Sequence, residues 1–190
     1  MVTEIREDED MPFYELPDGT IVRCDVIVNM LGVGNRLNNS QLFEIDINFC
    51  KQCILYDMKY METHAEKVNY LFKFLSIISP KQHKKMSKYY DKLNDERKIN
   101  FIEDIIENGF SIEQPPMYGN VDLDVLDKVY TEFGIEPMDA YVYKWGRKKK
   151  LLNKVIIADK YIYKLKHHKI VSGVINSFNC WKYYINKSAV

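Results

Sequence analysis

A single arginine stands where a predicted strand gives way to a predicted helix. The stretch GVGNRLNNSQLFE, residues 32–44, places Arg36 among glycines and small amide side chains before the sequence turns apolar. A guanidinium is a planar fork that grips two oxygens of a phosphate or a carboxylate, and free amides at a helix start also favour anions. Arg36 therefore either binds a phosphate or pairs with a carboxylate such as Glu44 to fix its own loop. From residue chemistry alone, the second interpretation is favoured.

More basic residues follow a β-rich run near the C-terminus. Lys164 and Lys166 alternate with their neighbours, so on a strand they share one face and His167 lies on the other. The three side chains can reach one ligand only if the strand ends in a bulge. His167 is equally consistent with a phosphate contact and with a structural role at a strand end.

A third basic cluster, GRKKK at residues 146–150, predicts the tip of a hairpin. Its cations either contact phosphates, which would make binding salt-dependent, or form a solvated turn. The residues concerned are Arg147, Lys148, Lys149 and Lys150.

The cysteines and histidines give weaker indications of chemistry. Cys50 and Cys53 form one C-x-x-C pair without a second pair of ligands, whereas zinc usually takes four ligands. Buried thiols are therefore favoured over a metal site. His64 and His83 lie in lysine-rich surroundings without partners at metal-ligand spacing, and we assign them no role.

The composition limits where a charged ligand can bind. Among 190 residues, Lys+Arg 27 balance Asp+Glu 27, so any attraction to nucleic acid or a membrane must be local. The acidic start MVTEIREDED does not resemble a secretory signal. The longest apolar stretch, YLFKFLSIIS, contains Lys73 and is too short to span a bilayer. We expect a soluble intracellular protein.

Local patterns predict the order strand, helices, strands. PDGT at residues 17–20 is a turn, and β-branched residues predict one strand over 20–30. Helical spacing runs over 41–79 with breaks, and Pro80 ends it. One apolar face of that helix consists of Leu42, Ile45, Phe49, Cys53 and Tyr56. The candidates for capping its start are Asn38, Asn39 and Ser40.

The remaining elements follow a polar run at residues 81–98. A helix over 99–109 ends at Gly109, and a short amphipathic helix over 121–134 ends at Gly134. Three segments within residues 139–178 are rich in β-formers and are separated by turn residues. The fold class is therefore α+β, and we expect the first strand to join the late ones.

A family resemblance is found at both ends of the chain. Residues 9–44 resemble a block of the β subunit of multisubunit DNA-dependent RNA polymerases, with E-D-M-P followed by N-P-L-G-V-P-S-R-M-N. Residues 115–134 resemble that family's P-V-F-D-G segment, and residues 154–169 resemble a strand pair ending in Lys/Arg-Leu-x-His. The matching positions of the first block are Glu9, Asp10, Met11, Pro12, Asp25, Asn29, Leu31, Gly32, Val33, Arg36, Asn38, Gln41 and Glu44.

The resemblance implies roles for the basic residues. In that family the arginine of P-S-R-M contacts the triphosphate of the incoming nucleotide, and Arg36 matches it. His167 matches a histidine near the catalytic centre. Lys164 matches the Lys/Arg position better than Lys166 does. With the resemblance, nucleotide binding becomes the favoured interpretation of Arg36.

The resemblance also implies an architecture. It predicts an acidic arm (1–10), a barrel strand with the nucleotide-contacting loop (11–44), a helical insertion (45–120), and a helix with a β-rich part (121–190) that packs with 11–44 as one domain. The strands would contribute to a double-psi β-barrel in the hybrid-binding region.

Departures from the family pattern point to a fragment. The family's H-G-N-K-G lysine stretch is not found before E-D-M-P, and IVS stands where D-D-K is expected. Met30, Gly34, Asn35 and Leu37 replace family residues in the loop. We expect a short β fragment of the split type found in large DNA bacteriophages. The alternative is a catalytically silent structural or interaction protein of a polymerase assembly.

The implied partners are other β-like and β′-like fragments, with DNA template, RNA–DNA hybrid and nucleoside triphosphates bound through the complex. Mg²⁺ would be held by the D-F-D-G-D aspartates of a β′-like partner, because the acids of NVDLDVLD belong to a predicted solvated helix face. Alone, the chain is expected to be inactive. The expected location is the cytoplasm of an infected bacterial host cell or the virion, with no membrane contact.

Overall fold

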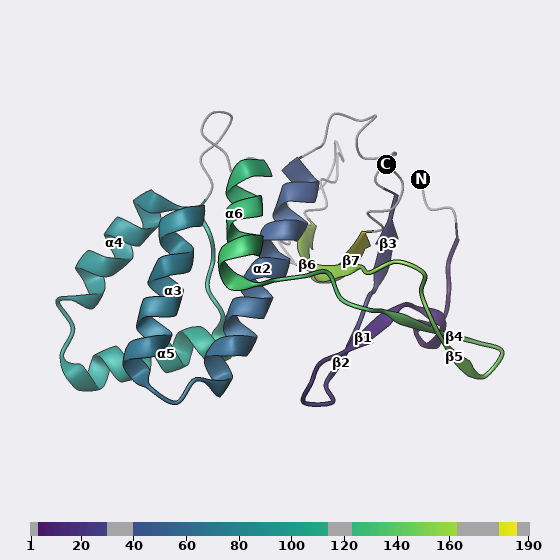
Figure 1. Cartoon of the computed structure of the whole chain (residues 1–190), viewed down its shortest axis with the longest axis horizontal. Helices are drawn as coiled ribbons and strands as arrows, with labels where there is room; N and C mark the ends of the chain where they lie inside the picture. The colour runs from purple at the N-terminus through teal and green to yellow at the C-terminus, as the bar shows by residue number, and fades with distance from the viewer. Residues whose placement is uncertain (1–3, 30–39, 114–122, 163–178, 186–190) are drawn as a thin grey trace, which may run out of the picture. The chain divides into compact units, whose positions relative to one another are not determined.

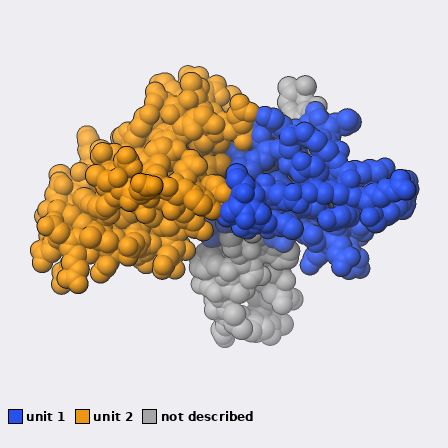
Figure 2. All heavy atoms as spheres, turned by 60° about the horizontal axis from the view of Figure 1, so that its bottom comes forward, with its two compact units in different colours: residues 1–49, 137–190 blue, residues 50–136 orange. Residues whose placement is uncertain are grey.

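A computed structural model describes residues 4–29, 40–113, 123–162 and 179–185. The chain divides into two compact units (Figure 2): the first contains Met1–Phe49 and Pro137–Val190, and the second contains Cys50–Glu136. The described residues form five α-helices, a 3₁₀ turn at Asp8–Asp10 and two small sheets (Figure 1). The predicted α+β class is confirmed. The domain limits given by the family resemblance stay a prediction.

The first sheet lies in the first unit and has the strand order β2-β1-β4-β5. Its strands are antiparallel and are β1 (Phe13–Glu15), β2 (Ile21–Arg23), β4 (Tyr141–Lys144) and β5 (Arg147–Lys150). The predicted turn at residues 17–20 joins β1 to β2. Gly19 has φ +84° there, a left-handed conformation that a glycine adopts without steric cost.

The second sheet, also in the first unit, has the order β3-β7-β6. It consists of β3 (Val26–Val28), β6 (Ile156–Ile162) and β7 (Asn179–Ile185). β3 runs parallel to β7, and β6 runs antiparallel to it. Strands from the start of the chain thus pair with late strands in both sheets, which confirms that prediction.

The single strand predicted over residues 20–30 is wrong. It is divided into β2 and β3, which belong to different sheets, and the division falls at Cys24 and Asp25. Cys24 is 1% exposed, and its N–H donates to the carbonyl of Pro12 at 2.9 Å. Burial of this thiol in the core beside Met11 and Tyr14 turns the chain from one sheet to the other. The described strands form these two sheets and no closed barrel.

The helices are α2 (Ser40–Tyr60), α3 (His64–Ile78), α4 (Pro80–Tyr90), α5 (Asp95–Asn108) and α6 (Leu123–Phe133). The break expected within residues 41–79 lies at 61–63. Gly109 (φ +73°) and Gly134 (φ +61°) follow α5 and α6 as predicted. In the second unit, the buried side chains come mainly from α3, α5 and α6: Val68, Leu71, Phe74, Leu75, Ile78, Ile102, Ile105, Leu126 and Val129.

The polar run at residues 81–98 is more helical than we predicted. Pro80 ends α3 and also begins α4, because proline suits the first position of a helix. α4 lacks an apolar stripe. It is held instead by polar and ring contacts, among them the edge-to-face packing of His83 and Tyr90 on Phe72.

The apolar face predicted for α2 is only part of what it buries. Ile45 and Phe49 are buried as expected. A second row at the same three-and-four spacing is buried as well and consists of Ile47, Cys50, Ile54 and Met58. No described helix is both long and apolar enough to cross a membrane.

Candidate functional site

The first half of α2 is bonded to the outer edge of β6. The Asn48 side chain donates from Nδ2 to the carbonyl of Asp159 at 2.8 Å, and the N–H of Tyr161 donates to Oε1 of Glu44 at 3.2 Å. Glu44 and Asn48 are four residues apart, so they project from one helix face. Residues 159 and 161 direct backbone groups outward from the described edge of the sheet. The helix thereby satisfies two backbone groups at the described edge of the sheet.

A buried lysine lies between those two strand residues. Lys160 is 8% exposed. Burial lowers its pKa, and the Glu44 carboxylate acts in the opposite direction. We call Glu44, Asn48 and residues 159–161 the α2–β6 seam. Sequence reasoning missed the roles of Asn48 and Lys160, although Glu44 stands in the first matching block.

The predicted nucleotide-contacting residues flank this seam in the chain. Arg36, Lys164, Lys166 and His167 lie outside the described residues, as do the capping candidates Asn38 and Asn39. Their described flanks are α2, which begins at Ser40, and β6, which ends at Ile162. The seam fixes these two flanks against each other, although residues 44 and 161 are 117 positions apart.

The strand register shows at which end of the second sheet β3 ends. Val28 pairs with Ile185, which also pairs with Ile156 at the start of β6. The chain therefore leaves β3 at the end of the sheet where β6 begins. The last residue of β6, Ile162, lies at the opposite end, about 20 Å away at the usual rise per residue.

The basic cluster at residues 147–150 is not a hairpin tip. It forms β5, and the tip is Trp145 and Gly146. The hairpin itself was predicted correctly. The tip is displaced because Gly146, with φ +69°, supplies the left-handed residue that a two-residue turn needs.

Two of the four β5 cations are paired with carboxylates. Lys148 forms an ion pair with Glu15, which raises the pKa of the lysine, and its Nζ lies 4.3 Å from the centre of the Tyr141 ring. Lys150 pairs with Asp139 at 2.6 Å. These contacts fix the hairpin to its own unit. Arg147 and Lys149 alternate with the two paired residues and lie on the other strand face.

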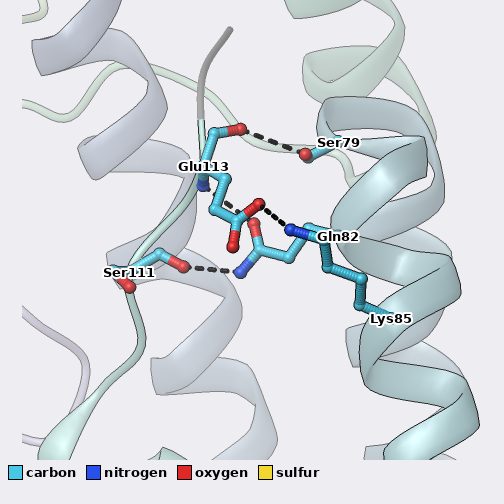
Figure 3. Close-up of polar contacts among 5 residues, drawn as sticks. All are labelled: Ser79, Gln82, Lys85, Ser111 and Glu113. Carbon is cyan, nitrogen blue, oxygen red and sulfur yellow. Dashed lines mark hydrogen bonds and ion pairs between the residues drawn. The ribbon is translucent and has the colours of Figure 1, made fainter.

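In the second unit, one glutamine holds a non-helical segment that follows α5 (Figure 3). The Gln82 side chain donates from Nε2 to the carbonyl of Ser111 at 2.7 Å and accepts from the N–H of Glu113 at 2.9 Å. Ser79 donates to the carbonyl of Glu113, and Lys85 pairs with its carboxylate at 2.8 Å. This Gln82 clamp precedes residues 114–122, which include the start of the second matching block and lie outside the described part of the chain.

The thiols are shielded. Cys50 is buried and Cys53 is half-buried. Burial raises the pKa of Cys53 to about 12, and it likewise raises the pKa of Cys24 to about 12. Asp57, which also acts on Cys53, accepts a hydrogen bond from the Tyr70 hydroxyl at 2.8 Å. Across the described ranges, no three or more His, Cys, Asp or Glu side chains gather in a way that would hold a metal ion.

The remaining candidates take structural positions. The ring Nε2 of His64 lies 2.9 Å from the Tyr90 hydroxyl. The acids of α6, Asp124 and Asp127, are exposed, in agreement with the predicted solvated face.

We compared the sequence with protein-family models and with curated proteins. No family model matches the sequence. The DNA-directed RNA polymerase subunit beta of Geotalea daltonii is 24% identical over 88% of this chain, and that of Syntrophus aciditrophicus is 25% identical over 93%. The corresponding subunit of Geobacter metallireducens is 26% identical over 88%. The chain is distantly similar to the bacterial RNA polymerase β subunit.

The similarity covers nearly all of this chain but a small part of the relatives. Each alignment spans 12% of the β subunit concerned. A match over 88% or more of 190 residues must include much of the helical second unit as well as the terminal blocks. The distant similarity is therefore a property of the whole chain and not of one short motif.

Proposed function

We propose that this chain is a β-like fragment of a multisubunit DNA-dependent RNA polymerase. The observation that carries the proposal is the similarity to β subunits along 88–93% of the chain. The α2–β6 seam supports it, because the seam joins residues of the first and last matching blocks, Glu44 and Tyr161, within one unit.

Within that polymerase, Arg36 contacts the triphosphate of the incoming nucleotide. Nucleotidyl transfer depends on positioning and on neutralising the charge of the leaving pyrophosphate, and a guanidinium can hold two phosphate oxygens at once. The seam supports this role because it holds α2, which starts four residues after Arg36, against β6. His167, and less strongly Lys164 and Lys166, follow β6 and are proposed to lie near the same active centre.

The chain acts only with partners in this proposal. Other β-like and β′-like fragments complete the enzyme. The complete enzyme then binds the DNA template and the RNA–DNA hybrid. The β′-like partner holds the catalytic Mg²⁺, which supplies charge neutralisation at the phosphates. The strands of the two sheets contribute to a double-psi β-barrel that is completed by a neighbouring fragment, and the isolated chain does not polymerise nucleotides.

The phage-type split origin extends the proposal to a location. A fragment of this kind works in the cytoplasm of an infected bacterial host cell or is packaged in the virion. Affinity purification of the tagged chain from its natural host, followed by mass spectrometry, tests both the partners and the origin. Co-purifying chains with the H-G-N-K-G lysines and the D-F-D-G-D aspartates support a split polymerase. Recovery of the chain alone, or with unrelated proteins, overturns it.

An exchange at Arg36 tests the nucleotide contact. In the assembled polymerase, Arg36→Ala should raise the KM for nucleoside triphosphates and lower kcat, at a cost of about 1.5–3 kcal/mol for a charged hydrogen bond. Arg97→Ala, at an exposed position of α5, removes the same charge far from the seam in sequence and should leave both constants unchanged. Unchanged activity of Arg36→Ala in a purified complex would favour the silent structural or interaction protein.

A further inference from the structure

The hairpin formed by β4 and β5 has two unlike faces. One face carries Lys148 and Lys150, each paired with a carboxylate, beside Tyr141 and Tyr143. The other face carries Lys144, Arg147 and Lys149. Among the residues that the structure describes, no carboxylate lies within ion-pair distance of these three cations. We call this second set, together with the tip residue Trp145, the unpaired face.

The cations of the unpaired face are crowded. Lys144 and Arg147 are direct cross-strand partners, and Lys149 lies one pair further along the same face. All three side chains are exposed. Like charges directly opposite each other on a sheet destabilise it. An anion bound across this face would relieve that repulsion.

Trp145 is placed where an aromatic residue is costly. The residue is 84% exposed, and its backbone has φ +52°, which bulky residues rarely adopt. Nζ of Lys144 lies 4.9 Å from the ring centre, and Nζ of Lys149 lies 5.3 Å from it. The hairpin thus presents a flat aromatic surface flanked by cations, and this tip contributes nothing to the core.

We propose that the unpaired face binds single-stranded nucleic acid. A base stacks on Trp145, and Lys144, Arg147 and Lys149 contact the adjacent phosphates. An exposed aromatic ring with cations around it is how proteins bind single strands without sequence preference, because every base has a free π-face. The four-residue strands are about 13 Å long, which suits a contact with two or three nucleotides.

The chemistry of the face favours this ligand over others. A duplex keeps its bases stacked inside, so it would use the cations but not the tryptophan. An acidic peptide would likewise use the cations, but its carboxylates are not aromatic and do not stack on the ring as a base does. The inference rests on the hairpin alone and does not need the proposed polymerase function. Single-strand binding by the hairpin variants therefore tests this inference, and the partners recovered with the tagged chain test the polymerase function separately.

Fluorescence anisotropy of a labelled oligo-U, measured with the full chain at several salt concentrations, tests the proposal. Trp145→Asn should weaken binding about tenfold without changing the dependence on salt. Because asparagine tolerates a positive φ, the same variant should keep or raise the melting temperature, which separates lost stacking from lost folding.

The cations are tested by salt dependence. Each phosphate contact on a single strand contributes about 0.7 to the slope of log affinity against log salt. Replacing Lys144, Arg147 and Lys149 with serine removes three such contacts and should therefore flatten the slope by about 2. The matched control replaces the exposed Lys84, Lys88 and Arg97 of the helical unit with serine, which removes the same net charge and should leave the slope unchanged.

Three results would overturn the proposal. The first is the absence of oligo-U binding by the wild-type chain at about 50 mM salt, where phosphate contacts are strongest. The second is an equal loss of binding in the control variant. The third is binding of duplex RNA as tight as that of oligo-U and insensitive to Trp145→Asn. A co-purifying protein that is lost with Trp145→Asn, without any oligo-U binding, would assign the face to a protein partner instead.

Discussion

Two helices of this chain each hold a neighbouring segment by hydrogen bonds from helix side chains to its backbone, but the side chains differ. In the helical second unit, the single amide of Gln82 bonds to both Ser111 and Glu113. In the first unit, the task is divided between Asn48, which donates to Asp159, and Glu44, which accepts from Tyr161. Residues 111 and 113 come just before the stretch 115–134 that resembles a polymerase block, and residues 159 and 161 lie inside the stretch 154–169. Each device therefore fixes described residues at or next to a stretch that resembles a polymerase block.

The division of labour determines how each device tolerates change. Gln82 is 8% exposed and supplies a donor and an acceptor from one planar group, so no other side chain of its length replaces both bonds. At the seam, either residue can be altered while the other bond remains. Glu44 is also the less buried of the pair and has a charged neighbour, Lys160. A single substitution at Gln82 should thus remove both bonds of the clamp at once, whereas single substitutions at the seam should each remove one bond.

The largest expected effect is at Gln82. Gln82→Ala removes two hydrogen bonds and leaves the backbone groups of Ser111 and Glu113 without this partner, which should lower the free energy of unfolding by about 2–3 kcal/mol. Urea denaturation followed by circular dichroism measures it. Lys84→Ala, at an exposed position of the same helix, should change stability by less than about 0.5 kcal/mol.

Gln82→Glu sharpens the test, because it keeps the acceptor and the size but loses the donor. It should be destabilising at neutral pH and should recover part of the loss at acidic pH, where the protonated carboxyl again donates. Equal stability of the Ala and wild-type chains would show that the clamp is incidental.

A smaller effect is expected at Asn48. Asn48→Ala leaves the half-buried carbonyl of Asp159 without its helix partner, so stability should fall by about 1–2 kcal/mol. Hydrogen exchange should localise the loss to β6 and to the first half of α2. Gln52→Ala, one turn later on the half-buried side of α2, serves as the control. A loss spread evenly over the chain would contradict a seam that acts locally.

The parts of the fold that the sequence predicted correctly are those set by local chemistry. Gly19 forms the turn between β1 and β2, and Gly109 and Gly134 each follow the end of a helix, because a left-handed residue is required at these points. Such a requirement is visible in a few adjacent letters. The pairing of early with late strands was also anticipated, because the helices separate two groups of β-branched segments. The α+β class follows from this order.

The parts that could not be predicted depend on distant partners. Gln82 stands in a polar run and acquires its role from residues about 30 positions away. The strand over residues 20–30 contains no glycine or proline to mark its division, which comes from burial of Cys24 in a core made by distant segments. The same holds for Asn48 and Lys160 at the seam. For Arg36 and His167, the structure describes only the flanking elements.

The two units should respond alike to alkaline pH through their thiols. Burial raises the pKa of Cys24 in the first unit and of Cys53 in the second to about 12. Above pH about 8.5, the unfolded thiols ionise while the folded ones stay protonated, so stability falls as pH rises towards 12. Each thiol should contribute about 1 kcal/mol of loss between pH 8.5 and 9.5.

Comparison of variants isolates this contribution from other groups that titrate in the same range. Cys24→Ala and Cys53→Ala should each have a shallower decline of stability than the wild type over that interval, and the double variant should be shallower still. Parallel curves for all four chains would mean that the thiols do not govern the alkaline response.

The smallest effect concerns the charge of the seam. Glu44→Gln keeps an acceptor for the Tyr161 N–H but removes the carboxylate that opposes the lowered pKa of Lys160. Stability at neutral pH should fall by about 0.5 kcal/mol, whereas Glu103→Gln, at an exposed position of α5, should have no measurable effect. A double-mutant cycle with Lys160→Met identifies the cause, because removal of the lysine should abolish the penalty if it is electrostatic. If the penalty persists without Lys160, the loss lies in the hydrogen bond to Tyr161. Glu44 would then stabilise the strand edge by hydrogen bonding, as Gln82 stabilises its segment.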